Sequence, residues 1–199
     1  MTCVRGEETI FSRVDLRAQA AEVVQLKGGN GSGKTSLLRL LCGIARPSAG
    51  TIRWNGTDIH HDPEDFRRSV GYVGHERAVC ADLTPLENVQ FANALGNPRP
   101  AAACRDALAR VQLAHVAEIP TRLLSAGQNQ RTALARLLVS HAALWFLDEP
   151  FTALDLEGHA IIEAMITQHA ASGGISIIAT HQPMILDGVR TSTVQLGSA

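Results

Sequence analysis

The segment from Gly28 to Ser36 has the residue types and the spacing needed to hold a phosphate chain. It reads Gly28-Gly29-Asn30-Gly31-Ser32-Gly33-Lys34-Thr35-Ser36, and its first eight residues fit the phosphate-loop pattern G-x-x-x-x-G-K-[ST]. Its glycines allow backbone N–H groups to surround the β-phosphate, and the positive end of a following helix would point at the same anion. Lys34 is expected to reach the β- and γ-phosphates, and Thr35 to ligate Mg²⁺. The segment therefore predicts a nucleotide site with Mg²⁺.

Three further side chains with suitable chemistry follow two apolar runs later in the chain. Asp148 and Glu149 end the run 144–147, and His181 ends the run that begins at Ile175. Asp148 is predicted to hold Mg²⁺ through water, and Glu149 to orient or deprotonate an attacking water. A ring nitrogen of His181 could hydrogen-bond the γ-phosphate. The alternative for each residue is ordinary polarity at a strand end, which the phosphate loop makes the weaker interpretation.

Residues 124–128 predict a second anion site. They read Leu124-Ser125-Ala126-Gly127-Gln128, and Ser125 and Gln128 have the spacing of a capping box at a helix start. The small Ala126 and Gly127 leave the amides of the first helical turn accessible to an anion. Because the chain already has one phosphate loop, this distant site is predicted to bind the triphosphate held by another protomer.

Strands and helices are expected to alternate, which favours an α/β fold with a mostly parallel sheet and crossover helices. The expected strands are 22–26, 143–147 and 175–179, and the expected helices are 34–41, 84–96, 101–113, 125–140 and 156–171. Residues 50–73 look β-rich, with turns at Asn55-Gly56 and His61-Asp62-Pro63. The helix at Thr84 is marked by a capping box with Glu87 and by a proline at its first position. We therefore expect one domain over 1–199.

The expected domain has two parts. Its core comprises about 1–75 and 143–199, with a β-rich N-terminal part, and a helical subdomain at about 76–142 is inserted into it.

Composition restricts the class of function and the compartment. The 199 residues carry a formal net charge of −1, so no strong field attracts nucleic acid, which is not an expected partner. The four cysteines are scattered without a C-x-x-C pair, which argues against a zinc knuckle and favours reduced thiols in a reducing compartment. We expect no signal peptide and no membrane span, so a membrane role would need a partner.

Taken together and in this order, the motifs resemble those of ABC transporter ATP-binding subunits over nearly the whole chain. The segment 124–128 resembles the ABC signature, with Ala126 where glycine is usual, and Thr152-Ala153-Leu154-Asp155 resembles the D-loop. The resemblance implies a P-loop NTPase of the ABC ATPase type that uses ATP and Mg²⁺. It also implies an ATP-bound homodimer, in which each ATP lies between one phosphate loop and the partner's signature. The residues implied at that interface are Ser125, Gly127, Gln128 and Asp155.

A narrower resemblance is to the haem-exporter ATP-binding subunits of cytochrome c biogenesis. It is carried by the strings 28–39, Val73-Gly74-His75, 124–128 and 144–155, and the stretch 173–182 is also similar. The resemblance implies an ATPase that works with an integral membrane permease subunit and haem-handling membrane proteins, peripherally on the cytoplasmic side of the inner membrane. ATP turnover could export haem or release a haem-loaded chaperone. An ABC transporter for another substrate is the alternative, and a soluble ABC regulator is a third class.

Two positions depart from the general ABC pattern. His75 stands where most relatives have a glutamine that touches Mg²⁺ and the attacking water. We expect His75 to be catalytic, with a charge that titrates near neutrality, and the alternative is a plain loop histidine. The aromatic residue on which many relatives stack adenine has no counterpart near Arg5, and Phe11 is too close to the phosphate loop. We therefore expect modest selectivity for the base.

Overall fold

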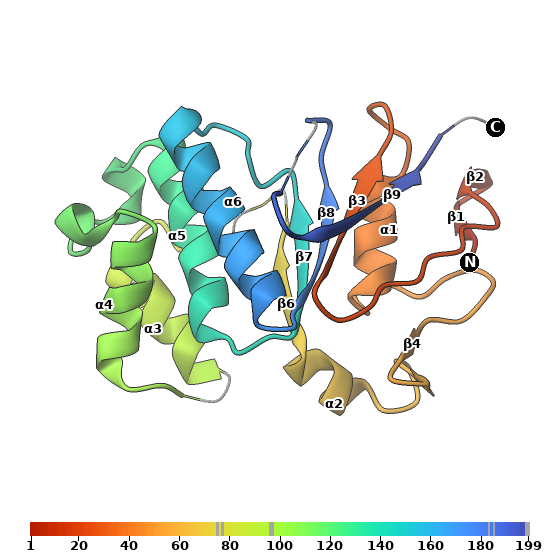
Figure 1. The fold of residues 1–199 in the computed structure, drawn as a ribbon, viewed down its shortest axis with the longest axis horizontal. Helices are drawn as coiled ribbons and strands as arrows, with labels where there is room; N and C mark the ends of the chain where they lie inside the picture. Colours follow the sequence, from red (N-terminus) through yellow and green to blue (C-terminus); the bar gives the residue numbers. More distant parts are fainter. Residues whose placement is uncertain (75, 77, 96–97, 183, 185, 198–199) are drawn as a thin grey trace.

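A parallel sheet of five strands forms the centre of the computed structural model, which describes residues 1–74, 76, 78–95, 98–182, 184 and 186–197. The strands lie in the order β6-β7-β8-β3-β9, and each neighbouring pair is parallel (Figure 1). All residues of β7 and β8 are buried, as expected for strands covered on both faces. The predicted α/β fold is confirmed. The strand bounds are β3 Glu22–Lys27, β6 Val70–Val73, β7 Leu144–Asp148, β8 Ile175–Ala179 and β9 Arg190–Gln195.

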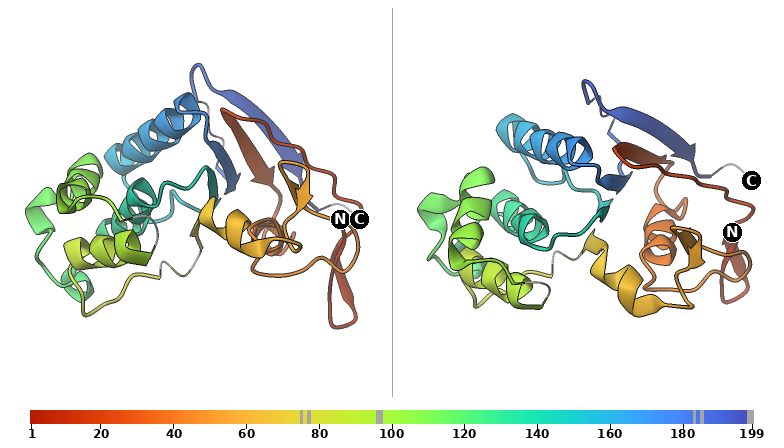
Figure 2. Two further views of the ribbon diagram at one scale, coloured as in Figure 1. Left: turned by 90° about the horizontal axis from the view of Figure 1, so that it is seen from below. Right: turned by 60° about the horizontal axis from the view of Figure 1, so that its bottom comes forward.

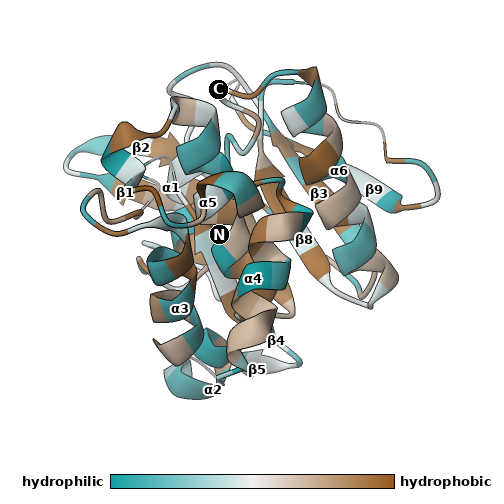
Figure 3. Ribbon diagram, turned by 90° about the vertical axis from the view of Figure 1, so that its left-hand side faces the viewer, coloured by the Kyte–Doolittle hydropathy of each residue, from teal (hydrophilic) through white to brown (hydrophobic). Residues whose placement is uncertain are grey.

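Helices α1 and α6 lie on opposite faces of this sheet. On one face, α1 (Lys34–Leu41) buries Leu37 in a cluster that includes Val24 of β3. On the other face, α6 (Leu156–Ala171) buries Ile162 in a cluster that includes Val23. Successive residues of a strand point to opposite faces, which explains why these neighbours belong to different clusters. Hydropathy colouring shows hydrophobic segments on β8, between the two covering layers (Figure 3).

Three further helices gather beyond β6, at one side of the sheet (Figures 1 and 2). They are α3 (Pro85–Leu95), α4 (Ala101–Arg110) and α5 (Ala126–Val139), and two 3₁₀ turns, Ala114–Val116 and Thr121–Leu123, connect α4 to α5. Thr84 Oγ1 accepts a hydrogen bond from Glu87 N at 3.2 Å, which confirms the predicted cap of α3. α4 ends at Arg110 rather than at residue 113, because Gln112 adopts a left-handed backbone with φ of 56°.

The part of the chain before β6 forms two antiparallel hairpins and a short helix. One hairpin pairs β1 (Cys3–Arg5) with β2 (Glu8–Phe11), and the other pairs β4 (Arg53–Trp54) with β5 (Thr57–Asp58). The predicted turn at Asn55-Gly56 is present, with both φ values positive as a type I′ turn requires. The expected turn at 61–63 instead opens α2 (Pro63–Arg68), because Asp62 caps the helix and Pro63 fits its first turn.

The lengths of the helices bear on any role at a membrane. In the part of the chain that the structure describes, no helix combines the length and the apolar character needed to cross a bilayer.

Candidate nucleotide site

The predicted phosphate loop connects the end of β3 to the start of α1, and two of its glycines, Gly28 and Gly33, are sterically required. Gly33 is the N-cap of α1 with a left-handed φ of 91°, and a Cβ there would lie 2.7 Å from Ile10 Cγ2. A Cβ at Gly28 would lie 2.4 Å from the backbone oxygen of Leu196, so the loop also packs closely against the segment after β9. These contacts keep the loop folded with the N-terminus of α1 pointing into it, which is the arrangement that binds a phosphate.

Lys34 and Thr35 lie where the pattern predicts. The Lys34 ammonium donates to the carbonyl oxygens of Gly28 and Gly29 at 2.8 and 3.0 Å, so it is held at the loop where it can meet an anion. Thr35 Oγ1 donates to Asp148 Oδ2 at 2.8 Å and joins α1 to the end of β7. A hydroxyl and a carboxylate side by side match the oxygen ligands that Mg²⁺ prefers, so this donor set fits the ion.

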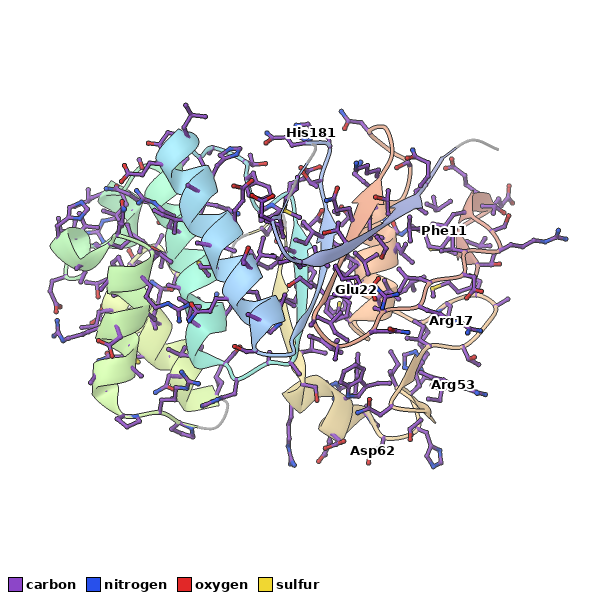
Figure 4. The ribbon with its side chains drawn as sticks, viewed as in Figure 1. Phe11, Arg17, Glu22, Arg53, Asp62 and His181 are labelled. Atoms are coloured by element: carbon purple, nitrogen blue, oxygen red, sulfur yellow. The ribbon has the colours of Figure 1, made fainter. Side chains whose placement is uncertain are left out.

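Glu149 and His181 lie at the carboxyl ends of β7 and β8. Glu149 Oε2 is 2.9 Å from His181 Nδ1, and His181 lies at the upper edge of the sheet in Figure 4. The backbone N–H of Glu149 donates to the Ala179 oxygen at 2.8 Å. A cavity of about 580 Å³ borders Asp148 and Glu149 and also Gln130. The fold therefore brings the predicted carboxylates and the histidine to one edge of the sheet, with room beside them for a water molecule.

Ser125 opens α5 as predicted, but it lies apart from the phosphate loop of its own chain. Gln128 N donates to Ser125 Oγ at 3.1 Å, and Ser125 N donates to Gln128 Oε1 at 2.9 Å, which completes the capping box. Ser125 and Ala126 are exposed at this helix start. α5 lies beyond β6, whereas α1 packs against β7 and β8 (Figure 1). This separation agrees with a role for Ser125 toward a second protomer.

The segment 152–155 lies beside Gly127. A Cβ at Gly127 would lie 2.7 Å from the backbone oxygen of Ala153, so this close approach needs a glycine. Asp155 is the N-cap of α6, and its Oδ1 accepts a hydrogen bond from Gly158 N at 2.8 Å. Its carboxylate is therefore engaged at the start of α6 and not at the phosphate loop, and its contribution to nucleotide binding stays a prediction.

Two other predictions concern His75 and the contact to the nucleotide base. His75 lies outside the described residues. Phe11 is buried, and a Cβ at Gly33 would lie 2.9 Å from its ring, so Phe11 packs against the phosphate loop as the sequence suggested.

Sequence analysis did not identify Gln130, although it borders the same cavity as Glu149. Gln130 is 3% exposed, and its Nε2 donates to the Pro150 oxygen at 3.1 Å. This bond joins α5 to the turn that follows Asp148 and Glu149. The signal that could have indicated Gln130 is a polar residue on the side of α5 that faces the protein interior.

Arg136 was also missed. Its Nη1 donates to the backbone oxygen of Ala78 at 2.5 Å, which ties α5 to the segment after β6. Burial lowers the pKa of the Arg136 guanidinium. The sequence signal that could have indicated Arg136 is one arginine between the apolar residues Ala135 and Leu137.

Known proteins resemble this chain in sequence and in fold. The ABC transporter family matches residues 11–152. The cytochrome c biogenesis ATP-binding export protein CcmA of Methylococcus capsulatus is 43% identical over 189 residues, covering 94% of this chain and 91% of that protein. The protein of the same name from Escherichia coli K12 is 44% identical over 184 residues, covering 92% and 87%. The dimeric ATP-binding cassette MJ0796 bound to ADP and Pi has a TM-score of 0.81 at 25% identity, covering 91% of this chain and 84% of that one. The chain belongs to the ABC transporter family, as one of its ATP-hydrolysing ATP-binding subunits.

Proposed function

We propose that this chain is the ATP-hydrolysing motor subunit of an ABC-type membrane complex in c-type cytochrome biogenesis. In that role, turnover would drive haem export or the release of a haem-loaded chaperone. The observation that carries the ATPase role is the 2.8 Å hydrogen bond from Thr35 to Asp148, because it joins the phosphate loop to the end of the strand that Glu149 follows. The role in cytochrome c biogenesis is supported by the similarity to the CcmA proteins, which are 43–44% identical over most of the chain.

Binding of the triphosphate would use the loop and its flanking groups. The backbone N–H groups of 31–34 and the N-terminus of α1 would hold the β-phosphate, and Lys34 would contact the β- and γ-phosphates. Thr35 and Asp148 would hold Mg²⁺, which neutralises charge on the phosphate oxygens when it is bound.

Hydrolysis would depend on the pair at the ends of β7 and β8. Glu149 would accept a proton from the attacking water or orient it, and this contributes roughly 10²–10⁴-fold to a rate. His181, which lies 2.9 Å from Glu149, would hold the carboxylate and hydrogen-bond the γ-phosphate. His75, which follows β6 in the sequence, is proposed to take part in catalysis.

A second copy of the chain would complete the site. The exposed start of α5 offers backbone groups and the dipole of a helix N-terminus, with Ser125 and Gly127, to a triphosphate held by the partner. Gln128 would hold the start of α5 in place through the capping box. Asp155 would lie near the interface, because the segment 152–155 lies beside Gly127. The dimeric state of the similar cassette MJ0796 supports this arrangement.

The remaining partners would be in the membrane. We propose an integral membrane permease subunit and haem-handling membrane proteins as partners, with this chain bound peripherally on the cytoplasmic side of the inner membrane. Two facts support this arrangement: the relatives are named export proteins, and the chain belongs to the ABC transporter family.

One purification tests this proposal. Glu149→Gln is expected to bind ATP, to stop turnover and to trap the dimer, and it is purified with ATP from native membranes for mass spectrometry. Glu64→Gln on α2, an exposed carboxylate of the β-rich part, is the matched control and should turn over ATP normally. Recovery of a permease subunit with haem-handling proteins supports the proposal. Recovery of a permease alone contradicts the cytochrome c role, and a variant that stays monomeric and active contradicts the role of Glu149.

A further inference from the structure

A second cavity, of about 370 Å³, lies at the edge of the sheet opposite to the phosphate loop. Its walls include Ala143 and Gly174, which immediately precede β7 and β8, and residues near the ends of α5 and α6. The phosphate loop follows β3, which is parallel to β8, so the two sites lie at opposite strand ends. Trp145, which lines the cavity, precedes Asp148 on β7 by about 10 Å, at ~3.3 Å per residue. The cavity is therefore separate from the nucleotide site.

Two guanidinium groups gather at this cavity. Those of Arg99 and Arg110 line it, together with the imidazole of His141. Arg99 Nε donates to His141 Nε2 at 2.6 Å, so these two groups lie side by side. Arg110 Nη2 donates to the amide oxygen of Gln168 at 2.6 Å. Among the described residues that line the cavity there is no carboxylate, although the whole chain carries a net charge of −1. The lining therefore concentrates positive charge without supplying a counter-ion.

Trp145, which lines the cavity, carries a buried hydrogen-bond donor. Trp145 is 5% exposed, and within the described residues its Nε1 has no hydrogen-bond partner. Its indole stacks on the imidazole of His169, with ring centroids 3.9 Å apart and planes 5° from parallel. His169 Nε2 likewise has no partner in the described part of the chain, and burial lowers the pKa of this imidazole. A buried N–H without an acceptor costs free energy that a bound acceptor would recover.

Gly174 makes room for the stacked rings of Trp145 and His169. A Cβ at position 174 would lie 2.3 Å from two ring atoms of His169, so glycine is needed for the imidazole to lie flat against Trp145. The stack in turn holds the indole in one orientation. This wall of the cavity thus depends on three residues: His169 near the end of α6, Trp145 near the start of β7 and Gly174 just before β8.

We propose that this cavity binds a small oxyanion, a phosphate or carboxylate group, between the guanidinium groups of Arg99 and Arg110 and the indole N–H of Trp145. Guanidinium and indole groups are donors only, so the ligand must supply acceptors. Planar guanidinium groups bind carboxylate and phosphate oxygens in pairs, and more strongly than they bind neutral acceptors. The bound anion would join α4 and α5 to α6. This inference rests on the cavity itself and goes beyond the proposed function.

Nuclear magnetic resonance of the full chain tests the site directly. The protein is labelled with ¹⁵N and saturated with ADP and Mg²⁺, so that the phosphate loop is occupied. Inorganic phosphate is then titrated at constant ionic strength, and succinate is titrated in a second arm. We expect a saturable shift of the Trp145 indole N–H signal, whereas the signal of Trp54 on β4 serves as the internal control. Saturation by phosphate alone or by succinate alone would identify which of the two groups the site takes.

Two arginines on α4 provide matched variants. Arg110→Gln is expected to weaken binding about tenfold, because a charge-assisted hydrogen bond is lost. Arg105→Gln makes the same charge change on the same helix, but Arg105 pairs with Glu118 at 3.1 Å and does not line the cavity, so binding should be unchanged. Arg99→Gln repeats the test if Arg110→Gln melts at a lower temperature. The proposal is overturned if neither anion gives a saturable shift, or if Arg105→Gln weakens binding as much as Arg110→Gln.

Discussion

Replacing Thr35 by valine is predicted to destabilise the ligand-free protein and to remove its response to Mg²⁺. Thr35 Oγ1 donates to the buried carboxylate of Asp148 at 2.8 Å. A hydrogen bond to a charged group contributes about 1.5–3 kcal/mol, and we take the lower end because Thr35 is half-buried. For a chain of this size, a loss of that amount lowers Tm by roughly 3–6 °C. Valine keeps the volume and the β-branch, so packing changes little.

Thermal unfolding in the Glu149→Gln background measures both effects, because this variant is expected not to consume ATP. Three proteins in this background are compared, with threonine, valine or serine at position 35. Each is melted without ligand, with ATP and a chelator, and with ATP and Mg²⁺. Saturating ligand stabilises by about 2.7 kcal/mol at one hundred times its Kd, so a lost contribution from Mg²⁺ is measurable. Thr35→Ser keeps the hydroxyl and should behave as Thr35. If Thr35→Val melts at the same temperature as Thr35 and retains the increment from Mg²⁺, the assigned ligand role is wrong.

Three further changes have defined outcomes. Because burial lowers the pKa of His169 below its usual 6.5, the unfolded chain binds more protons as the pH falls through that value. The free energy of unfolding should therefore fall between about pH 7.5 and 5.5 more for wild type than for His169→Gln in urea titrations, and equal slopes would contradict this. Ser125→Ala should cost about 1 kcal/mol of stability and weaken ATP-dependent dimerisation in sedimentation, with monomer ATP affinity unchanged. Lys34→Ala should abolish nucleotide binding in isothermal titration, and unchanged affinity would refute the phosphate-loop assignment.

Features set by local sequence were predictable, because their physical cause lies within a few residues. The glycines at 28 and 33 are required by close contacts in the loop, and the helix that starts at Lys34 follows from the same pattern. The capping boxes at Thr84 and Ser125 need only a hydroxyl and an acidic or amide side chain one turn later. Each of these elements is found where it was expected.

Elements that depend on tertiary contacts were not predictable in the same way. β9 (Arg190–Gln195) has no apolar run, and it is a strand because its backbone pairs with β3 at the edge of the sheet. α2 is too short for a periodic pattern, and only its cap marks it. The bond from Arg136 to the backbone of Ala78 joins residues far apart in sequence, and no local pattern specifies that pairing.

Asp148 and Glu149 are neighbours in the sequence, yet they contact different partners because the backbone turns between them. Asp148 ends β7 and accepts a hydrogen bond from Thr35 on α1. Glu149 has a left-handed backbone with φ of 50°, which costs a residue other than glycine about 1–2 kcal/mol, and this turn directs its carboxylate to His181. Glycine would adopt the same backbone with less strain but would remove the carboxylate. Because this backbone places the carboxylate beside the cavity and within 2.9 Å of His181, it agrees with the predicted role of Glu149 toward an attacking water, and that role stays a prediction.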